Sequence, residues 1–297
     1  METVGVNVTH DASFCRCVNG EVNLFIEEER LSRKKHDTMP VKTVMEYQES
    51  NFAGITGLEY HDYSLKDTCN FFDVIFKKKI PNHDYRTYDQ HHFLHAMCGF
   101  YNSEFEEADV VVVDGLGNFV DEENHECATR WHVKKPTQVK LLERQVSSKF
   151  GIKTDRHDYW SMGVGMAYAS ISDYLGFGQT ESGKVMGLAP YGKEDPNIKP
   201  FVIDGRVNSK LFYRTRYGAN FIPYDYLPEK VDVRDQRFMN LAYRLQKDFE
   251  KWMTDFILKC ESKNIVLTGG CALNCVANYE YLKHLPKDVK LYIEPVS

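Results

Sequence analysis

The chain has 297 residues, enough for one large domain or for two lobes of about 150 residues each. Hydrophobic residues make up 42% of it and aromatic residues 13%, so it can bury a substantial core, which excludes a disordered protein. The formal net charge of −6 argues against a nucleic-acid-binding surface, and no direct nucleic-acid partner is expected.

The amino-terminal part opens with a β-rich pattern. Val4–Val8 is predicted to be a first strand and Ser13–Val18 a second. Asn19-Gly20 between two β-rich runs is a strong hairpin signal, and it leads into a third strand, Glu21–Glu27.

The rest of the chain alternates helical and extended patterns. The elements expected after the hairpin, in chain order, are a helix that begins at Pro40 and buries Val41, Val44, Met45 and Tyr47, a helix over His91–Tyr101, a buried strand over Asp109–Val113, a β pair over residues 126–145, a helix over Ser161–Leu175, an irregular connector over residues 196–234, and the longest amphipathic helix, Arg237–Lys259. Strand, helix and strand then follow to Ile293. Two such hairpin-led units favour an α/β or mixed α+β fold of two stacked lobes with a cleft between them, over residues of about 1–105 and 106–297.

The cysteines and the apolar runs bear on where the protein is found. Eight scattered cysteines with no repeated C-x-x-C pair are typical of reduced, buried thiols. No apolar run approaches the ~18 residues that a membrane-spanning helix needs, and Met1–Thr3 has no targeting region. We therefore expect a cytoplasmic protein with no membrane partner.

A diglycine junction near the carboxyl end is the most informative segment. The apolar run Ile265–Leu267 meets Gly269-Gly270, and a helical pattern follows. Backbone without side chains lets amide N–H groups converge on an anion, with the helix dipole pointing the same way. Asn274 stands one helical turn before a second asparagine, and both can face a ligand. The alternative is an ordinary tight strand-to-helix turn.

Two histidines spaced for one helix face suggest a metal site. His91 and His95 are four residues apart, and Asp114 at the end of the next strand can add a hard oxygen ligand. Two imidazoles and a carboxylate with open positions suit ferrous iron or zinc. The alternative is a helix surface with two solvated histidines.

Three further segments carry polar or charged groups. At the end of the first strand, His10 can act as a general acid or base, and small polar groups such as Asp11 can approach phosphate. The run Glu27–Asp37 is either a solvated face or an anion clamp built on Arg33, Lys34 and Lys35. The glycine-rich segment around Lys184 is either a connector or a phosphate loop, although its spacing is not the Walker spacing.

Taken together, these segments resemble the carbamoyltransferases of the nodulation and tobramycin type. The matching blocks, in family order, are His10–Ser13, Glu27–Asp37, His91–Ala96, Val112–Gly115, Lys184–Gly192 and Gly269–Asn278. The resemblance implies an actin/Hsp70/sugar-kinase-like core of the Kae1-like type. One departure is that Cys271 stands where valine is more usual.

The resemblance also implies roles for site residues. His91, His95 and Asp114 correspond to ligands of an iron or similar ion, Fe²⁺, Zn²⁺ or Mg²⁺, that touches nucleotide phosphate. The segment with Gly269, Gly270 and Asn274 corresponds to the cradle of ATP, and we expect Lys184 and Asp11 to contribute to the same cofactor. His10 and Lys35 are expected to contact the carbamoyl or phosphoryl group.

Similar enzymes use ATP and carbamoyl phosphate to make a carbamoyl-adenylate, then pass the carbamoyl group to a hydroxyl of a sugar or natural product. The family continues past the position of Ser297 into another metal-binding aspartate and a YrdC-like domain. We therefore expect an O-carbamoyltransferase that needs this carboxyl half, supplied by a separate chain. The alternatives are a non-catalytic nucleotide- and metal-binding partner subunit and, more weakly, an unrelated phosphotransferase of the same fold class.

Overall fold

The structure, a computed structural model, describes residues 2–7, 11–47, 55–59, 90–117, 120, 124–148, 159–160, 162–214 and 219–295. The chain divides into two compact units, Met1–Leu94 and His95–Ser297. The division falls inside the continuous helix α4 (His91–Asn102), earlier than the predicted boundary near residue 105. Most of α4 groups with the second unit because it packs on the sheet of that unit.

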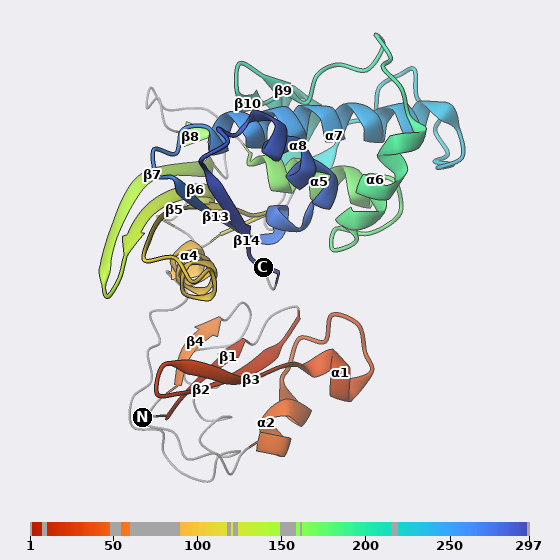
Figure 1. The fold of residues 1–297 in the computed structure, drawn as a ribbon. Coiled ribbons are helices and arrows are strands. Elements are labelled where there is room, and N and C mark those ends of the chain that lie inside the picture. Colours follow the sequence, from red (N-terminus) through yellow and green to blue (C-terminus); the bar gives the residue numbers. More distant parts are fainter. Residues whose placement is uncertain are drawn as a thin grey trace. The chain divides into compact units, whose positions relative to one another are not determined.

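The first unit is built on a four-stranded sheet of order β3-β2-β1-β4 (Figure 1). Its strands are β1 (Glu2–Asn7), β2 (Ser13–Val18), β3 (Glu21–Glu27) and β4 (Ile55–Glu59). The first three pair antiparallel, and β4 runs parallel to β1. The predicted hairpin turn is confirmed, with Asn19 and Gly20 at φ 54° and 90°, the backbone that an Asn-Gly hairpin turn needs.

Two short helices follow β3 in the first unit, α1 (Glu28–Ser32) and α2 (Val41–Tyr47). The helix predicted after Pro40 is confirmed, but its predicted burial is wrong in part. Val44 is buried, whereas Val41 and Met45 are 41% and 50% exposed. The apolar spacing identified the helix but not the face that packs, because Thr43 takes an inward position instead.

The second unit contains a six-stranded sheet of order β14-β13-β5-β6-β7-β8. Its strands are β5 (Glu107–Val113), β6 (Asn124–Lys134), β7 (Gln138–Ser148), β8 (Tyr159–Trp160), β13 (Asn264–Thr268) and β14 (Lys290–Ile293). The strands β5, β6 and β7 form an antiparallel meander, and β13 runs parallel to β5 on its other side. The predicted strand before Asp114 and the β pair after it are therefore confirmed.

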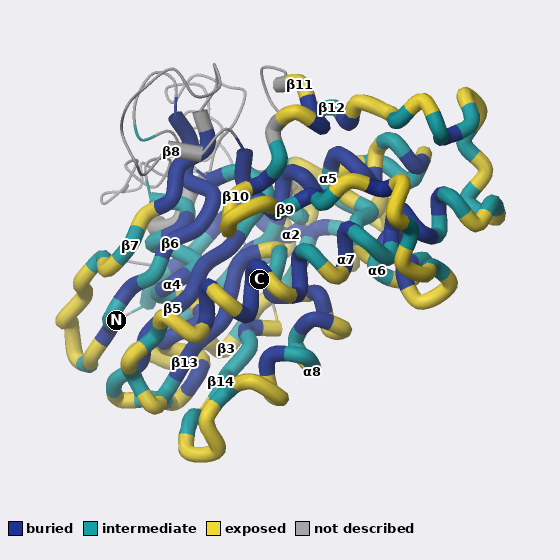
Figure 2. The backbone as a smooth tube through the Cα atoms, turned by 90° about the horizontal axis from the view of Figure 1, so that it is seen from above, coloured by how far each residue is buried: buried dark blue, intermediate teal, exposed yellow. Residues whose placement is uncertain are grey.

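Helices cover both faces of this sheet. Helices α5 (Val164–Tyr174), α7 (Gln236–Ile257) and α8 (Cys275–His284) share one core with Val111 and Val113. Helix α4 lies on the opposite side (Figure 1), where a methyl added to Gly99 would come within 2.9 Å of Val266 Cγ1. The alternating valines of β5 thus serve two cores, and the central strands β5 and β6 are largely buried (Figure 2).

Helix α7 is the long amphipathic helix that the sequence predicts. Asp235 caps its amino terminus by accepting a hydrogen bond from the backbone N–H of Arg237. Its buried stripe consists of Leu241, Leu245, Phe249, Met253 and Phe256. The preceding connector contains only short elements, β9 (Val202–Ile203), β10 (Arg206–Val207), η3 (Ser209–Leu211), β11 (Phe212–Arg214) and β12 (Ala219–Phe221). Within the described ranges, no helix is both long enough and apolar enough to cross a bilayer.

The two units repeat one strand topology. In each, an antiparallel three-stranded meander is extended by a parallel strand beside its first strand: β3-β2-β1-β4 in one and β7-β6-β5-β13 in the other. The predicted α/β class is confirmed. The repeat also agrees with the duplicated core of an actin/Hsp70/sugar-kinase-like fold.

Candidate functional site

The structure brings His91, His95 and Asp114 together. One potential ligand atom from each of the three lies within 4.8 Å of the other two, and His95 Nε2 is 3.5 Å from Asp114 Oδ2. Since metal–ligand bonds at zinc are about 2.0–2.2 Å long, donor atoms at such separations can share one ion. All three residues are half-buried. The donor set of two imidazoles and a carboxylate therefore fits a divalent transition metal.

Helix α4 holds the two histidines on one face. The face that packs inward carries His92, Ala96, Gly99 and Phe100, all buried. His91 and His95, four residues apart, stay half-buried beside it. Asp114 comes from the other partner, since it directly follows β5, and its Oδ1 accepts a hydrogen bond from the Gly115 N–H at 2.7 Å.

The diglycine turn packs directly against this aspartate. Gly269 has φ +88°, and a Cβ there would lie 2.5 Å from the carbonyl oxygen of Val113. A Cβ at Gly270 would lie 3.0 Å from Asp114 Oδ1. Both positions need glycine because any side chain would press on the end of β5. The predicted anion-binding turn and the predicted metal ligand thus share one location in the second unit.

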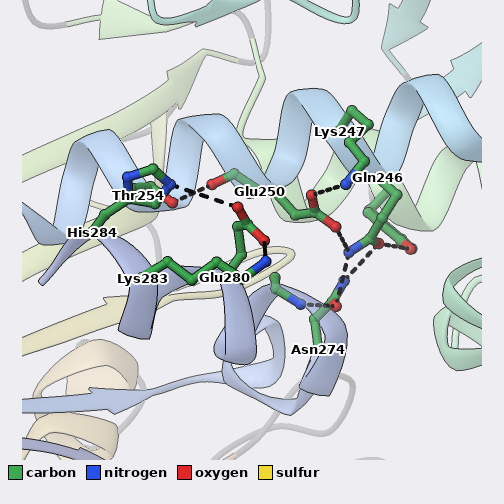
Figure 3. A network of polar contacts seen from close by, with 10 residues as sticks. Gln246, Lys247, Glu250, Thr254, Asn274, Glu280, Lys283 and His284 are labelled. Carbon is green, nitrogen blue, oxygen red and sulfur yellow. Dashed lines mark hydrogen bonds and ion pairs between the residues drawn. The ribbon is translucent and has the colours of Figure 1, made fainter. Parts of the chain in front are cut away.

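Asn274 holds the start of helix α8 behind this turn (Figure 3). Its Oδ1 accepts hydrogen bonds from Ala277 N at 3.0 Å and from Gln246 Nε2 at 3.1 Å, and its Nδ2 donates to Gln246 Oε1 at 2.9 Å. The side chain is engaged within the protein and the residue is only 8% exposed. Its contact with a nucleotide stays a prediction. Asn278, expected to face the same ligand, donates to the Ala272 carbonyl instead, at 2.7 Å.

The sequence did not reveal the partners of Asn274. Gln246 and Glu250 of α7 are buried and hydrogen-bonded to each other at 3.0 Å, and the Tyr168 hydroxyl donates to Gln246 at 2.7 Å. Burial raises the pKa of Tyr168, so its hydroxyl stays protonated as a donor. The available signal was two polar residues four apart, each directly following an apolar position of the α7 stripe.

In the first unit, the charge run Glu27–Asp37 combines buried and exposed parts. Glu28 is 2% exposed, and its carboxylate accepts hydrogen bonds from the backbone N–H groups of Lys42 and Thr43 at 2.9 and 2.8 Å. Residues 33–35, all basic, are exposed. The solvated-face alternative is therefore wrong for Glu28, while the anion clamp around Lys35 stays a prediction. His10 lies outside the described residues.

Lys184 lies in a short helix. The expected loop is α6 (Ser182–Leu188) followed by the 3₁₀ turn η2 (Ala189–Tyr191), so neither predicted backbone form, connector or phosphate loop, is correct. The Lys184 side chain is 56% exposed and lies 3.3 Å from Glu181 Oε2. Glycine is compatible with this helix because Gly183 and Gly187 have no atom within 4 Å of an added Cβ.

Comparisons with known proteins agree on one family. The family model described as carbamoyltransferase N-terminus matches residues 55–297. The chain is 25% identical over 312 residues to nodulation protein NolNO of Sinorhizobium fredii (strain NBRC 101917 / NGR234), covering 92% of the chain and 42% of that protein. It is 26% identical over 200 residues to nodulation protein NolO of Bradyrhizobium diazoefficiens (strain USDA 110), covering 65% of the chain and 33% of that protein. The chain thus spans about half or less of the length of these curated relatives.

Among solved structures, the fold is similar to component A of (R)-2-hydroxyglutaryl-CoA dehydratase of Acidaminococcus fermentans, at 12% identity and a TM-score of 0.48 over 100% of this chain and 92% of that one. It is also similar to full-length HypF, at 10% identity and a TM-score of 0.49 over 99% of this chain and 52% of that one. Both scores are below 0.5, so the family assignment rests on the family model.

Proposed function

Because the chain belongs to the carbamoyltransferase N-terminus family, we propose that it takes part in ATP- and carbamoyl phosphate-dependent transfer of a carbamoyl group to a hydroxyl of a sugar or natural product. The observation that carries this proposal is the convergence at the end of β5. There the diglycine turn packs on Asp114, which with His91 and His95 forms a three-donor set. Phosphate chemistry needs such a concentration of backbone N–H groups and metal donors.

The residues on this surface have separate proposed roles. His91, His95 and Asp114 would hold a divalent ion, whose positive charge would stabilise phosphate oxygens of ATP. The backbone at Gly269 and Gly270 would admit the nucleotide phosphates close to the main chain, because no side chain stands in the way. In the first unit, Lys35 would bind the carbamoyl or phosphoryl group through its ammonium.

A second candidate is a non-catalytic nucleotide- and metal-binding subunit that acts through a partner. The share of the curated relatives that the chain covers, 42% of one and 53% of another, favours considering it. On either proposal, the complete reaction would need the segment that the relatives carry beyond the matched part, in the same polypeptide or in a separate chain.

The two candidates are separated by an assay of carbamoyl transfer. The chain is incubated with ATP, radiolabelled carbamoyl phosphate and a panel of sugars, alone and with the unmatched carboxyl half of a relative expressed separately. Labelled sugar that disappears in Asp114→Asn but not in His284→Ala supports the transferase. Nucleotide and metal binding without labelled sugar in any mixture would support the subunit instead.

A further inference from the structure

A side-chain hydrogen bond joins two turns of the first unit. His36 Nδ1 lies 2.7 Å from Asp11 Oδ1, although 25 residues separate them in the chain. Both residues have left-handed backbone, with φ +59° at Asp11 and +55° at His36. Such conformations are uncommon for residues other than glycine and persist where surrounding contacts hold them. The two turns are therefore built around this pair.

Main-chain contacts fasten the same two turns. The Ala12 N–H donates to the Asp37 carbonyl at 2.9 Å, one residue beyond the side-chain pair on each segment. The His36 N–H donates to Glu29 Oε2 at 3.2 Å, which ties the second turn back to helix α1. We call the Asp11–His36 pair, with these two main-chain bonds, the latch.

The latch stands next to the exposed basic segment Arg33–Lys35. His36 directly follows Lys35, so the backbone that carries the Lys35 ammonium is fixed at its carboxyl side. Asp11 directly follows His10, the other residue expected to contact the carbamoyl or phosphoryl group. A lysine on a loose loop would lose both backbone and side-chain freedom on binding a ligand, at a cost of about 1–2 kcal/mol for each residue ordered.

We propose that His36 and Asp11 are positioning residues, whose hydrogen bond presets the Arg33–Lys35 segment to bind the phosphate of carbamoyl phosphate. This inference rests on the proposed function for its ligand. The ligand atoms of Asp11, Glu29 and His36 also lie within 4.8 Å of one another. The latch explains them without an ion, since the Arg30 guanidinium is already 3.3 Å from Glu29 Oε1.

Trypsin tests the latch without any ligand, because Arg33, Lys34 and Lys35 are exposed cleavage sites. His36→Leu is expected to speed cleavage at these residues about tenfold, the loss of one coupled contact. His36→Asn keeps a side-chain N–H donor and tolerates left-handed backbone, so it should restore wild-type resistance. The matched control is His284→Leu, which removes a histidine–carboxylate pair with Glu280 on α8. Equal cleavage rates in His36→Leu and wild type would overturn the latch.

A double-mutant cycle tests its role in binding. Carbamoyl phosphate titrations by calorimetry compare wild type, His36→Leu, Lys35→Ala and the double variant. We expect His36→Leu to weaken binding about tenfold alone and less than about twofold in the Lys35→Ala background. Equal weakening in both backgrounds, or a zinc ion lost with His36, would overturn the positioning role. Wild-type protein that binds no carbamoyl phosphate would contradict the proposed function, and the trypsin result would still decide the latch.

Discussion

Individual residues in the second unit show what the candidate site demands of the backbone. Gly269 is the sharpest case, since its φ of +88° and its approach to the Val113 carbonyl both exclude a side chain. Gly270 adds the contact with Asp114. A single methyl group at either position should therefore be costly, for reasons that differ between them.

We predict that Gly269→Ala lowers the free energy of unfolding by roughly 2–4 kcal/mol, because it adds backbone strain and a contact of 2.5 Å with Val113 O. Urea denaturation followed by circular dichroism measures this. Gly183→Ala in α6 is the matched control, since an added Cβ there meets no atom within 4 Å and should raise stability by up to about 1 kcal/mol. Similar losses in both variants would contradict the assigned packing.

Thiol reactivity is a second prediction for single residues. Burial raises the pKa of Cys260 to about 12 and that of Cys271 well above its ordinary value, so both remain protonated at pH 8. Cys98 and Cys275 are exposed. Iodoacetamide at pH 8 should alkylate Cys98 and Cys275 first, as read by peptide mass spectrometry. Labelling of Cys260 at the rate of Cys275 would contradict its burial.

At the scale of elements, α7 and α8 are joined by a polar contact that sets the start of α8. The reciprocal amide pair Gln246–Asn274 connects them (Figure 3), and Asn274 caps α8. An amide buried in this way stabilises only while its partner remains, because an unpaired buried amide keeps its desolvation cost.

We therefore expect Gln246→Leu to lower the free energy of unfolding by about 1–3 kcal/mol and to speed amide hydrogen exchange in the first turn of α8. Lys251→Ala on the same helix breaks only the exposed pair with Asp255 and should cost less than about 1 kcal/mol. Unchanged exchange at Ala277 in Gln246→Leu would show that Asn274 caps α8 without this support.

The sequence predicted much of each element and little of the contacts between them. The run of valines before Asp114 and the long stripe of α7 are local patterns, so β5 and α7 followed from spacing alone. The histidine spacing likewise placed His91 and His95 on one helix face. The pairing of Asn274 with Gln246 spans 28 residues and depends on helix packing, which no local pattern encodes. The same holds for the pairing of Asp11 with His36.

For the whole molecule, the order of strands explains how distant segments form one site. β5 and β13 are parallel neighbours in the sheet, so the residues that follow them, Asp114 and Gly269-Gly270, emerge side by side. Helix α4 packs on the same sheet and brings its histidines to this edge. The site is thus a consequence of the topology that the two units repeat.

Metal binding should stabilise the folded chain as a whole. An ion at one hundred times its dissociation constant adds about 2.7 kcal/mol to the free energy of unfolding. Zinc or ferrous iron should therefore raise the midpoint of thermal unfolding in wild type and in His284→Ala, but not in His95→Ala. A rise of equal size in all three proteins would mean that the ion binds elsewhere.

The most direct test of the central claim is the metal content of the purified chain, measured by plasma mass spectrometry after loading with ferrous iron or zinc and removal of excess ion. We predict about one ion per chain in wild type and in His284→Ala, and almost none in His91→Ala, His95→Ala or Asp114→Asn, because each removes one of three donors. Metal content unchanged by all three substitutions would contradict the site at the end of β5.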